Sequence, residues 1–272
     1  MYDMHIHSIF SDGRLSPEEI LNKLKKDHFK GSITDHDNFD TYRDSKYKES
    51  EHFIPGIEFG ITYKGEEIHI LAYYIDTEDN KLIQLCEKLQ EDRNNRIIKT
   101  IYNLNGINID ITLEEVQSKA GGTILSRSHI AELLIEKGYV SSMKDAFVNY
   151  LIPGKPGYVV KKAVDMEFII ETIKNNHAVS ILAHPKTIKN QDLIIELIHM
   201  GIDGIEIINS KHSYEDIIKY YKLAEKYHLL KTCGSDCHGK EYNGKILLGN
   251  YGMNEAMLIP IIHLHQLRKK GL

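Results

Sequence analysis

The chain has little cysteine and no long apolar run, and both shortages narrow what it can be. Its 272 residues include three cysteines, Cys86, Cys233 and Cys237, which are too few and too unevenly spaced for a disulfide framework. No apolar stretch approaches the roughly 20 residues that cross a bilayer. The first residues also lack the basic segment followed by an apolar one that marks a secretory signal. We therefore expect a cytoplasmic protein that does not enter a membrane.

An excess of positive charge is also missing. The chain holds 39 acidic and 34 basic residues, for a formal net charge of −5. A protein that grips nucleic-acid backbone without regard to sequence is usually basic. The balance argues against a general nucleic-acid coat and leaves room for a local basic pocket that holds one phosphate. The charge balance is thus compatible with a small phosphorylated partner but does not require one, and no segment points to an obligate protein partner.

The first part of the chain reads as a strand, a helix and a second strand. Residues 2–10 alternate in the period-2 manner of a strand. Ser16, Pro17 and Glu19 then form the capping box of a helix, and a short strand follows at residues 31–34. This order predicts parallel strands joined by a right-handed crossover.

Two further strands meet at Lys64–Gly65. If those two residues form the hairpin loop, Gly60 pairs with His69. Glu58 and His69 then lie on one face as diagonal neighbours, within joint reach of one ion.

The sequence pattern changes between residues 81 and 159, where most apolar residues recur at the spacing of a helix. A second capping box joins Thr112 to Glu115, and Gly121–Gly122 interrupts the helical pattern. We therefore expect an inserted helical subdomain at 81–159, within a main domain formed by residues 1–80 and 160–272.

After residue 160 the alternation of helices and strands returns. Strands are expected at 178–183, 204–208 and 229–234, and chemically active residues follow their carboxyl ends. Because active sites of parallel barrels lie at that face, the pattern predicts an α/β fold with a barrel or barrel-like sheet.

Histidines and carboxylates recur at these strand ends. His5 and His7 lie two residues apart on a strand, so both project from one face and can share an ion. Asp236 and His238 repeat the spacing after the last strand. A lone pair of this kind is more often a surface pattern than a site, but its repetition on one predicted face makes accident a poor explanation. Neutral imidazole and carboxylate are the ligand set for Zn, Mn or Fe.

Taken together, these motifs resemble those of the PHP (polymerase and histidinol phosphatase) family of phosphoesterases. The resemblance covers nearly the whole chain and rests on Asp3-Met4-His5-Ile6-His7, Ser11-Asp12-Gly13, Thr34-Asp35-His36-Asp37, Gly56-Ile57-Glu58, Ala183-His184-Pro185 and Gly234-Ser235-Asp236-Cys237-His238-Gly239. It implies a distorted (β/α)7 barrel that holds two or three divalent ions (Mn, Fe or Zn). The implied metal ligands are His5, His7, Asp12, His36, Glu58, His69, His184, Asp236 and His238.

The resemblance also implies how the ligands divide among three ions. His5, His7 and Asp236 would hold the first, and Glu58 would bridge it to the second. His69 and His184 would complete the second ion's ligands. Asp12, His36 and His238 would hold the third.

Within the family, the chain is most similar to the stand-alone nucleotide phosphatases, which include 3′,5′-nucleoside bisphosphate phosphatases and 5′-end RNA exonucleases. That branch carries an inserted helical subdomain with a phosphate-binding motif, which reads Arg127-Ser128-His129 here, with serine in place of proline. The resemblance thus implies hydrolysis of a phosphomonoester by a metal-bound hydroxide. The candidate catalytic residues are Glu58, Asp236, His212 and Arg127, and the candidate phosphate-binding residues are Arg127, His129 and His212.

Residues outside the motifs are weaker candidates. Glu206, on an apolar strand, is a candidate support for a ligand histidine. Lys155 and Tyr158 lie in a Pro-Gly loop that is more simply read as solvated than as a pocket wall.

Four alternatives stay open at this point. A 5′-3′ exonuclease acting on short RNA or DNA ends needs a groove that sequence does not reveal. A histidinol-phosphate phosphatase fits the insertion less well, and a non-catalytic metal-binding module fits the full ligand set poorly. An amidohydrolase also opens with His-x-His, but such enzymes usually bridge their metals with a lysine, where Glu58 stands here.

Overall fold

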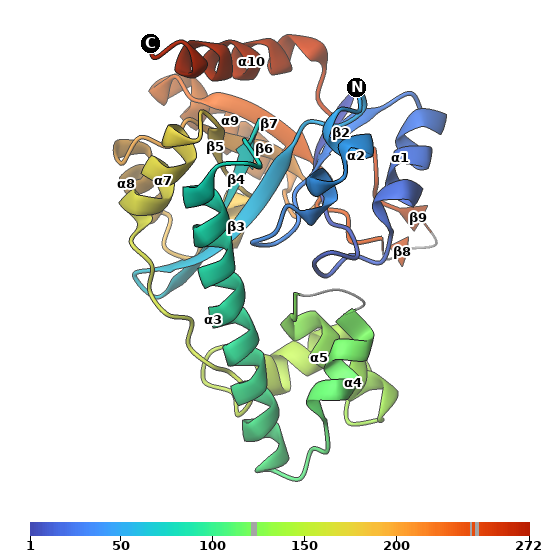
Figure 1. Cartoon of the computed structure of the whole chain (residues 1–272). Helices are drawn as coiled ribbons and strands as arrows, with labels where there is room; N and C mark the ends of the chain where they lie inside the picture. The colour runs from blue at the N-terminus through green and yellow to red at the C-terminus, as the bar shows by residue number, and fades with distance from the viewer. Residues whose placement is uncertain (121–123, 240, 243–244) are drawn as a thin grey trace.

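The computed structural model describes residues 1–120, 124–239, 241–242 and 245–272 (Figure 1). Most of its strands belong to two sheets, and a small separate hairpin adds two more. The strands are β1 (Tyr2–Ile6), β2 (Lys30–Ile33), β3 (Gly56–Tyr63), β4 (Glu66–Tyr73), β5 (Val179–Leu182), β6 (Gly204–Asn209), β7 (Leu230–Gly234), β8 (Glu241–Tyr242) and β9 (Lys245–Ile246).

The larger sheet has the order β3-β4-β5-β6-β7, and β1 and β2 form a separate parallel pair. β4 runs antiparallel to both its neighbours, whereas β5, β6 and β7 are parallel. Single bridges, Ile6 to Cys237 and His36 to Glu58, link the pair to the two edges of the larger sheet. Within the described residues no continuous ladder closes the strands, so the sheets define an α/β fold without a fully bonded barrel.

Helices alternate with these strands and cover them. They are α1 (Pro17–Lys26), α7 (Met166–Asn175), α8 (Asp192–His199), α9 (Tyr214–Tyr227) and α10 (Glu255–Lys269), with the short turns η1 (Asp40–Arg43), α2 (Ser45–Lys48) and η3 (Pro185–Thr187). None of the helices in the described ranges is long and apolar enough to cross a membrane.

Local sequence signals explain several boundaries. The predicted capping box of α1 is present, since Ser16 accepts from the Glu19 backbone and Glu19 accepts from Ser16. The predicted hairpin register is also confirmed, because Gly60 pairs with His69. Lys64 and Gly65 both have positive φ, 48° and 82°, which suits the turn to the twist of the strands.

The segment between β4 and α7 is helical and has a hydrophobic cluster of its own. It contains α3 (Asn80–Asn105), α4 (Leu113–Ala120), α5 (Arg127–Glu136), α6 (Met143–Ala146) and the π-helical turn η2 (Phe147–Leu151). The long α3 runs from the strands to a group of shorter helices at its far end (Figure 1). Leu104, Ile130 and Leu134 are central to that cluster. The predicted capping box at Thr112 and Glu115 is confirmed, whereas the Gly121–Gly122 break lies outside the described residues.

Candidate metal centre and adjoining cavity

All nine side chains predicted as metal ligands meet near one edge of the strands. Three lie within strands: His5 in β1, Glu58 in β3 and His69 in β4. The other six follow the ends of β1, β2, β5 and β7: His7, Asp12, His36, His184, Asp236 and His238. His69 and His238 are partly exposed and the other seven are buried, so the sequence prediction of convergence agrees with the geometry.

Glu58 lies at the middle of this group and has imidazoles on both oxygens. Its Oε1 is 2.8 Å from His69 Nδ1 and 3.0 Å from His184 Nε2. Its Oε2 is 3.0 Å from His36 Nδ1 and 3.2 Å from His7 Nε2. A carboxylate surrounded in this way on both oxygens is placed to bridge two ions.

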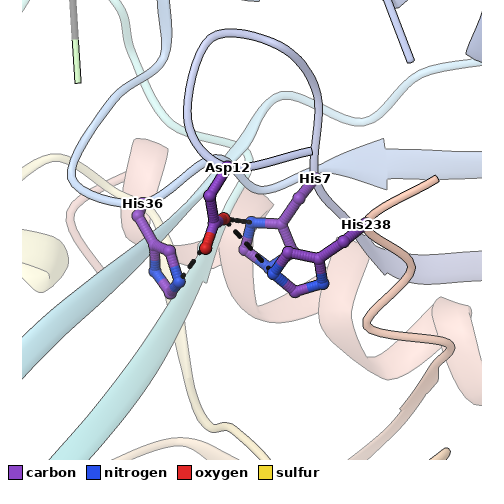
Figure 2. A group of neighbouring side chains, drawn as sticks. All are labelled: His7, Asp12, His36 and His238. Atoms are coloured by element: carbon purple, nitrogen blue, oxygen red, sulfur yellow. Dashed lines mark ion pairs between the residues drawn. The ribbon is translucent and has the colours of Figure 1, made fainter. Parts of the chain in front are cut away.

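Asp12 gathers a second set of imidazoles, as Figure 2 shows. Its Oδ1 lies 3.2 Å from His238 Nε2 and 3.9 Å from both His7 Nδ1 and His36 Nε2. The loop that carries Asp12 needs glycine at the next position, because a Cβ on Gly13 would stand 2.3 Å from the His7 carbonyl oxygen.

The donor atoms form overlapping groups, each spanning less than 4.8 Å. The groups are His7 with Asp12, His36 and His238; His5 with His7 and Glu58; His5 with His184 and Asp236; and His36 with Glu58 and His69. His5 and His7 each belong to two groups, whereas the family division assigns each histidine to one ion.

Several buried polar atoms here lack a hydrogen-bond partner among the described residues. They include Asp12 Oδ1, His36 Nδ1, Glu58 Oε2 and Asp236 Oδ2. His5 Nε2 and His7 Nε2 also face each other at 3.2 Å. Buried polar atoms are normally satisfied, and clustered imidazole and carboxylate atoms of this kind fit divalent metal ions.

Burial and neighbouring charges set the protonation of these groups. Burial lowers the pKa of His36 to about 4, and burial together with Lys211 lowers the pKa of His184 to about 4. Both imidazoles are therefore neutral near pH 7, the form that binds a metal. Burial opposes the charged form of His7 as well, but Asp236 and Glu58 outweigh it and raise its pKa to about 10, so this position attracts a cation or a proton.

Backbone strain is concentrated beside the centre. Asp37, His184 and Asp236 have φ values of 51°, 25° and 53°, in a region that non-glycine residues rarely adopt. Each such residue costs about 1–3 kcal/mol and tends to occur at functional sites.

Buried carboxylates outside the ligand set hold the ligands in place. Glu206 Oε1 lies 3.1 Å from His5 Nδ1, and its Oε2 accepts from the His184 backbone at 2.7 Å. These contacts place Glu206 beside the predicted ligand His5, as its predicted support role requires. A proton on His5 Nδ1 leaves Nε2 free for a metal. Asp3 and Asp35 belong to the family motifs, but the sequence assigned them no role. They accept hydrogen bonds from the backbone of Ser235 and Ser8 and so fix two loops that carry predicted ligands.

After β6, Lys211 contacts the centre. Its ammonium forms an ion pair with the Asp236 carboxylate. The predicted residue His212 instead hydrogen-bonds the Ile207 carbonyl at 2.7 Å and packs on Tyr220. No contact among the described residues joins His212 to the ligands. Lys211 was missed because a lysine after a strand is an ordinary surface pattern.

The phosphate motif lies at the start of α5. Arg127 donates from one nitrogen to both Glu67 oxygens, at 3.1 and 2.8 Å. His129 is buried, and its Nδ1 accepts from the Ser126 backbone to complete a capping box. Ser128, which stands in the place of the family's proline, donates to Asp12 Oδ2 at 3.3 Å. The motif therefore contacts the predicted ligand Asp12 directly.

A cavity of about 470 Å³ opens beside the centre and is within the size range of small-molecule sites. His69 and His184 form its inner side. Its wall carries several cations: Arg96, Arg127, Lys161, Lys189 and Lys211. Tyr158 also lines it, although the sequence favoured a solvated loop there.

Comparison with known proteins places this geometry in context. No protein-family profile matches the chain. The 5′-3′ exoribonuclease Rnm of Escherichia coli is 30% identical over 251 residues, which are 88% of this chain and 85% of that protein. The 3′,5′-nucleoside bisphosphate phosphatase of Chromobacterium violaceum is 27% identical over 254 residues, 89% of each chain.

A solved structure from Chromobacterium violaceum has the same fold. It is named an amidohydrolase with bound sulfate and no metal, and it matches with a TM-score of 0.85 at 25% identity. The match covers 98% of this chain and 96% of that one.

The fold, the ligand cluster and these relatives define a metal-dependent hydrolase of phosphoester bonds. The chain belongs to the PHP family of phosphoesterases.

Proposed function

We propose that this chain hydrolyses a phosphomonoester of a nucleotide-like substrate such as a nucleoside 3′,5′-bisphosphate. The observation that carries the proposal is the cation-lined cavity whose inner side is formed by the ligands His69 and His184. A phosphate held there lies against the ligand cluster, and the volume suits one nucleotide. The phosphatase relative is named for the same chemistry.

The nine predicted ligands would hold two or three ions of Mn, Fe or Zn, divided as the family implies. Glu58 supports this assignment because imidazoles from four segments contact its two oxygens. When bound, such ions supply an activated water and neutralise charge on phosphoryl oxygens. Glu206 then keeps His5 oriented through Nδ1, and Asp236 holds Lys211 beside the cavity.

Arg127 would clamp the substrate phosphate, since its planar fork matches phosphate oxygens. Lys211 would provide charge relief where His212 was predicted to act, because its ammonium contacts the ligand cluster. For His129 we propose an indirect role, in which its capping bond fixes the first turn of α5 and so aims Arg127. His212 remains a candidate that its present contacts do not favour.

Residues 81–159 would act as an inserted subdomain that supplies Arg127 to the active site. The separate hydrophobic cluster of these helices supports this division. The remaining strands, bridged at Ile6–Cys237 and His36–Glu58, would form the distorted (β/α)7 barrel of the family.

A second candidate is 5′-3′ exonuclease activity on short RNA, which the name of the 30% identical relative favours. The amidohydrolase alternative is less favoured, because Glu58 occupies the bridging position and Lys211 already pairs with Asp236. A substrate panel separates the candidates. Chelated protein is restored with each metal and offered a nucleoside 3′,5′-bisphosphate, a 5′-phosphorylated dinucleotide, histidinol phosphate and an amide or lactone set.

Fastest phosphate release from the bisphosphate is the expected result. Release of nucleotides from the dinucleotide at equal or greater efficiency would favour the exonuclease instead. Bound metal without turnover on any substrate would indicate a non-catalytic module.

Glu58→Gln tests the centre itself. The change removes one negative charge among five imidazoles, since His5 Nε2 also lies 3.4 Å from Glu58 Oε1. Turnover should therefore be abolished while the fold is kept. Initial rates and circular dichroism provide the two measurements. Glu51→Gln, a substitution of the same kind at an exposed position, is the matched control, and near-normal activity of Glu58→Gln would contradict the assignment.

A further inference from the structure

Arg127, the proposed phosphate-binding residue, already pairs with a carboxylate, that of Glu67. Arg127 directs one nitrogen at both oxygens of Glu67, and the guanidinium lies 6.0 Å from the Phe147 ring centre. Glu67 belongs to β4, two residues before the ligand His69, and its Oε1 is 3.7 Å from His69 Nε2. The carboxylate therefore stands between the clamp and the metal centre, in the cavity that a substrate phosphate would enter.

The cavity carries more positive charge than its own carboxylates balance. Arg96 pairs with Asp92 at 3.1 Å, and Arg127 pairs with Glu67. Lys161, in contrast to these two paired arginines, is buried, with only 6% of it exposed. Its ammonium donates to the Gly60 carbonyl. No carboxylate in the described part of the chain forms an ion pair with Lys161, so the cavity has room for one more negative charge.

We propose that Glu67 is the resident anion of this cavity and a specificity-determining residue, whose carboxylate leaves the Arg127 fork when a substrate phosphate arrives. This inference rests on the proposed function, because it takes Arg127 as the phosphate clamp. The exchange needs no new contact on the protein side: phosphate oxygens replace carboxylate oxygens on the same nitrogen.

Glu67 is suited to leave. Its side chain is 45% exposed and lies near the Lys64–Gly65 turn of the hairpin. An ion pair whose carboxylate is half exposed is held more weakly than a buried pair, because water screens the attraction. A phosphate carries more charge than a carboxylate and gains Lys161 as an additional partner, which Glu67 does not reach as an ion pair.

The first test measures the dissociation constant of inorganic phosphate for metal-restored protein by isothermal titration calorimetry. Because Glu67→Gln removes the competing charge, we expect phosphate to bind about two- to fivefold more tightly. Glu196→Gln is the matched control, since it removes a similarly exposed carboxylate, 38% against 45% for Glu67, from the Lys64 pair outside the cavity. Unchanged or weaker phosphate binding by Glu67→Gln would overturn the inference, as would an equal gain in Glu196→Gln.

A double-mutant cycle locates the effect on the clamp. In an Arg127→Gln background, Glu67→Gln should give no further gain, because there is no fork left to compete for. A gain that persists in that background would show a general effect of charge and would also overturn the inference. The titration does not need turnover. If the metal-restored wild type hydrolyses none of the substrate panel, the proposed function fails while the phosphate measurements still decide the role of Glu67.

Discussion

Lys161 lies in an unusual environment for a lysine, since only 6% of it is exposed. Burial lowers the pKa of its ammonium to about 8, even though Asp37 acts in the opposite direction. In the unfolded chain a lysine has a pKa of about 10.4. Between these two values the unfolded chain binds more protons than the folded one, so stability rises with pH in that window. Below pH 8 the lysine is charged in both the folded and the unfolded chain, so burial of the charge lowers the unfolding free energy by its full amount.

Lys161→Met should therefore stabilise the protein at pH 7, by about 2–3 kcal/mol. It should also remove the rise in unfolding free energy between pH 8 and 10. Urea unfolding of chelated protein in phosphate-free buffer, at pH 7, 8, 9 and 10, gives both quantities. Lys162→Met, at the exposed neighbouring position, should change neither. A variant as pH-dependent as the wild type would mean that Lys161 is solvated in the folded state.

Residues differ in how far the sequence reveals them. His5 and His7 were found because their spacing recurs at another strand end on the same predicted face, and Glu58 because a predicted hairpin put it beside His69. No sequence pattern marked Lys211 or Lys161, since lysine is common on any surface. Only the folded structure shows that Lys161 is buried and that Lys211 pairs with Asp236.

Among the elements, α3 connects the helical segment to the metal centre. From its side, Arg93 donates two hydrogen bonds to Asp37 Oδ2, at 3.0 and 2.7 Å. The pair is nearly buried, with side-chain exposures of 11% and 1%. Asp37 follows the predicted ligand His36 directly and has positive φ. The helix thus fixes the backbone beside a predicted ligand.

Arg93→Ala should lower the unfolding free energy by about 3–5 kcal/mol, because it leaves the Asp37 carboxylate buried without its partner. Metal content after dialysis should fall as His36 loses its fixed backbone. Urea unfolding and elemental analysis are the measurements. Lys99→Ala, an exposed position on the same helix, controls for the loss of charge. The double variant Arg93→Ala with Asp37→Asn should recover part of the stability, and a failure to recover any would place the cost elsewhere.

The ends of helices and the turns between strands could be predicted where residues close together in the sequence determine them. The capping box at Ser16 and the turn at Lys64–Gly65 depend on neighbouring residues alone, and both have their expected form. Helix α10 was not predicted. It contains Pro260, and two of its apolar side chains, Leu258 and Ile261, are buried in a cluster shared with the strands. That packing is a tertiary effect that the sequence pattern does not reveal.

At the scale of the whole molecule, the spacing of apolar residues was enough to predict the alternation of strands and helices and the helical segment. It does not predict how the edges of the sheets meet. Closure depends on isolated bridges at Ile6–Cys237 and His36–Glu58. Each bridge adjoins predicted metal ligands, since His36 and Glu58 are themselves predicted ligands and Cys237 lies between two others, Asp236 and His238. Ions at this seam would therefore hold together strands that few hydrogen bonds join.

Chelation should accordingly destabilise the entire fold as well as the active site. At a free metal concentration about 1,000 times the dissociation constant, binding to the folded state alone adds about 4 kcal/mol of stability. With roughly 2–4 °C per kcal/mol for a chain of this size, the melting temperature should rise by about 8–16 °C when Mn²⁺ is restored. Differential scanning calorimetry of chelated and restored protein measures this shift. Glu58→Gln should lose most of the shift and Glu51→Gln should keep it. An identical melting temperature with and without metal would show that the strands meet without help from the ions.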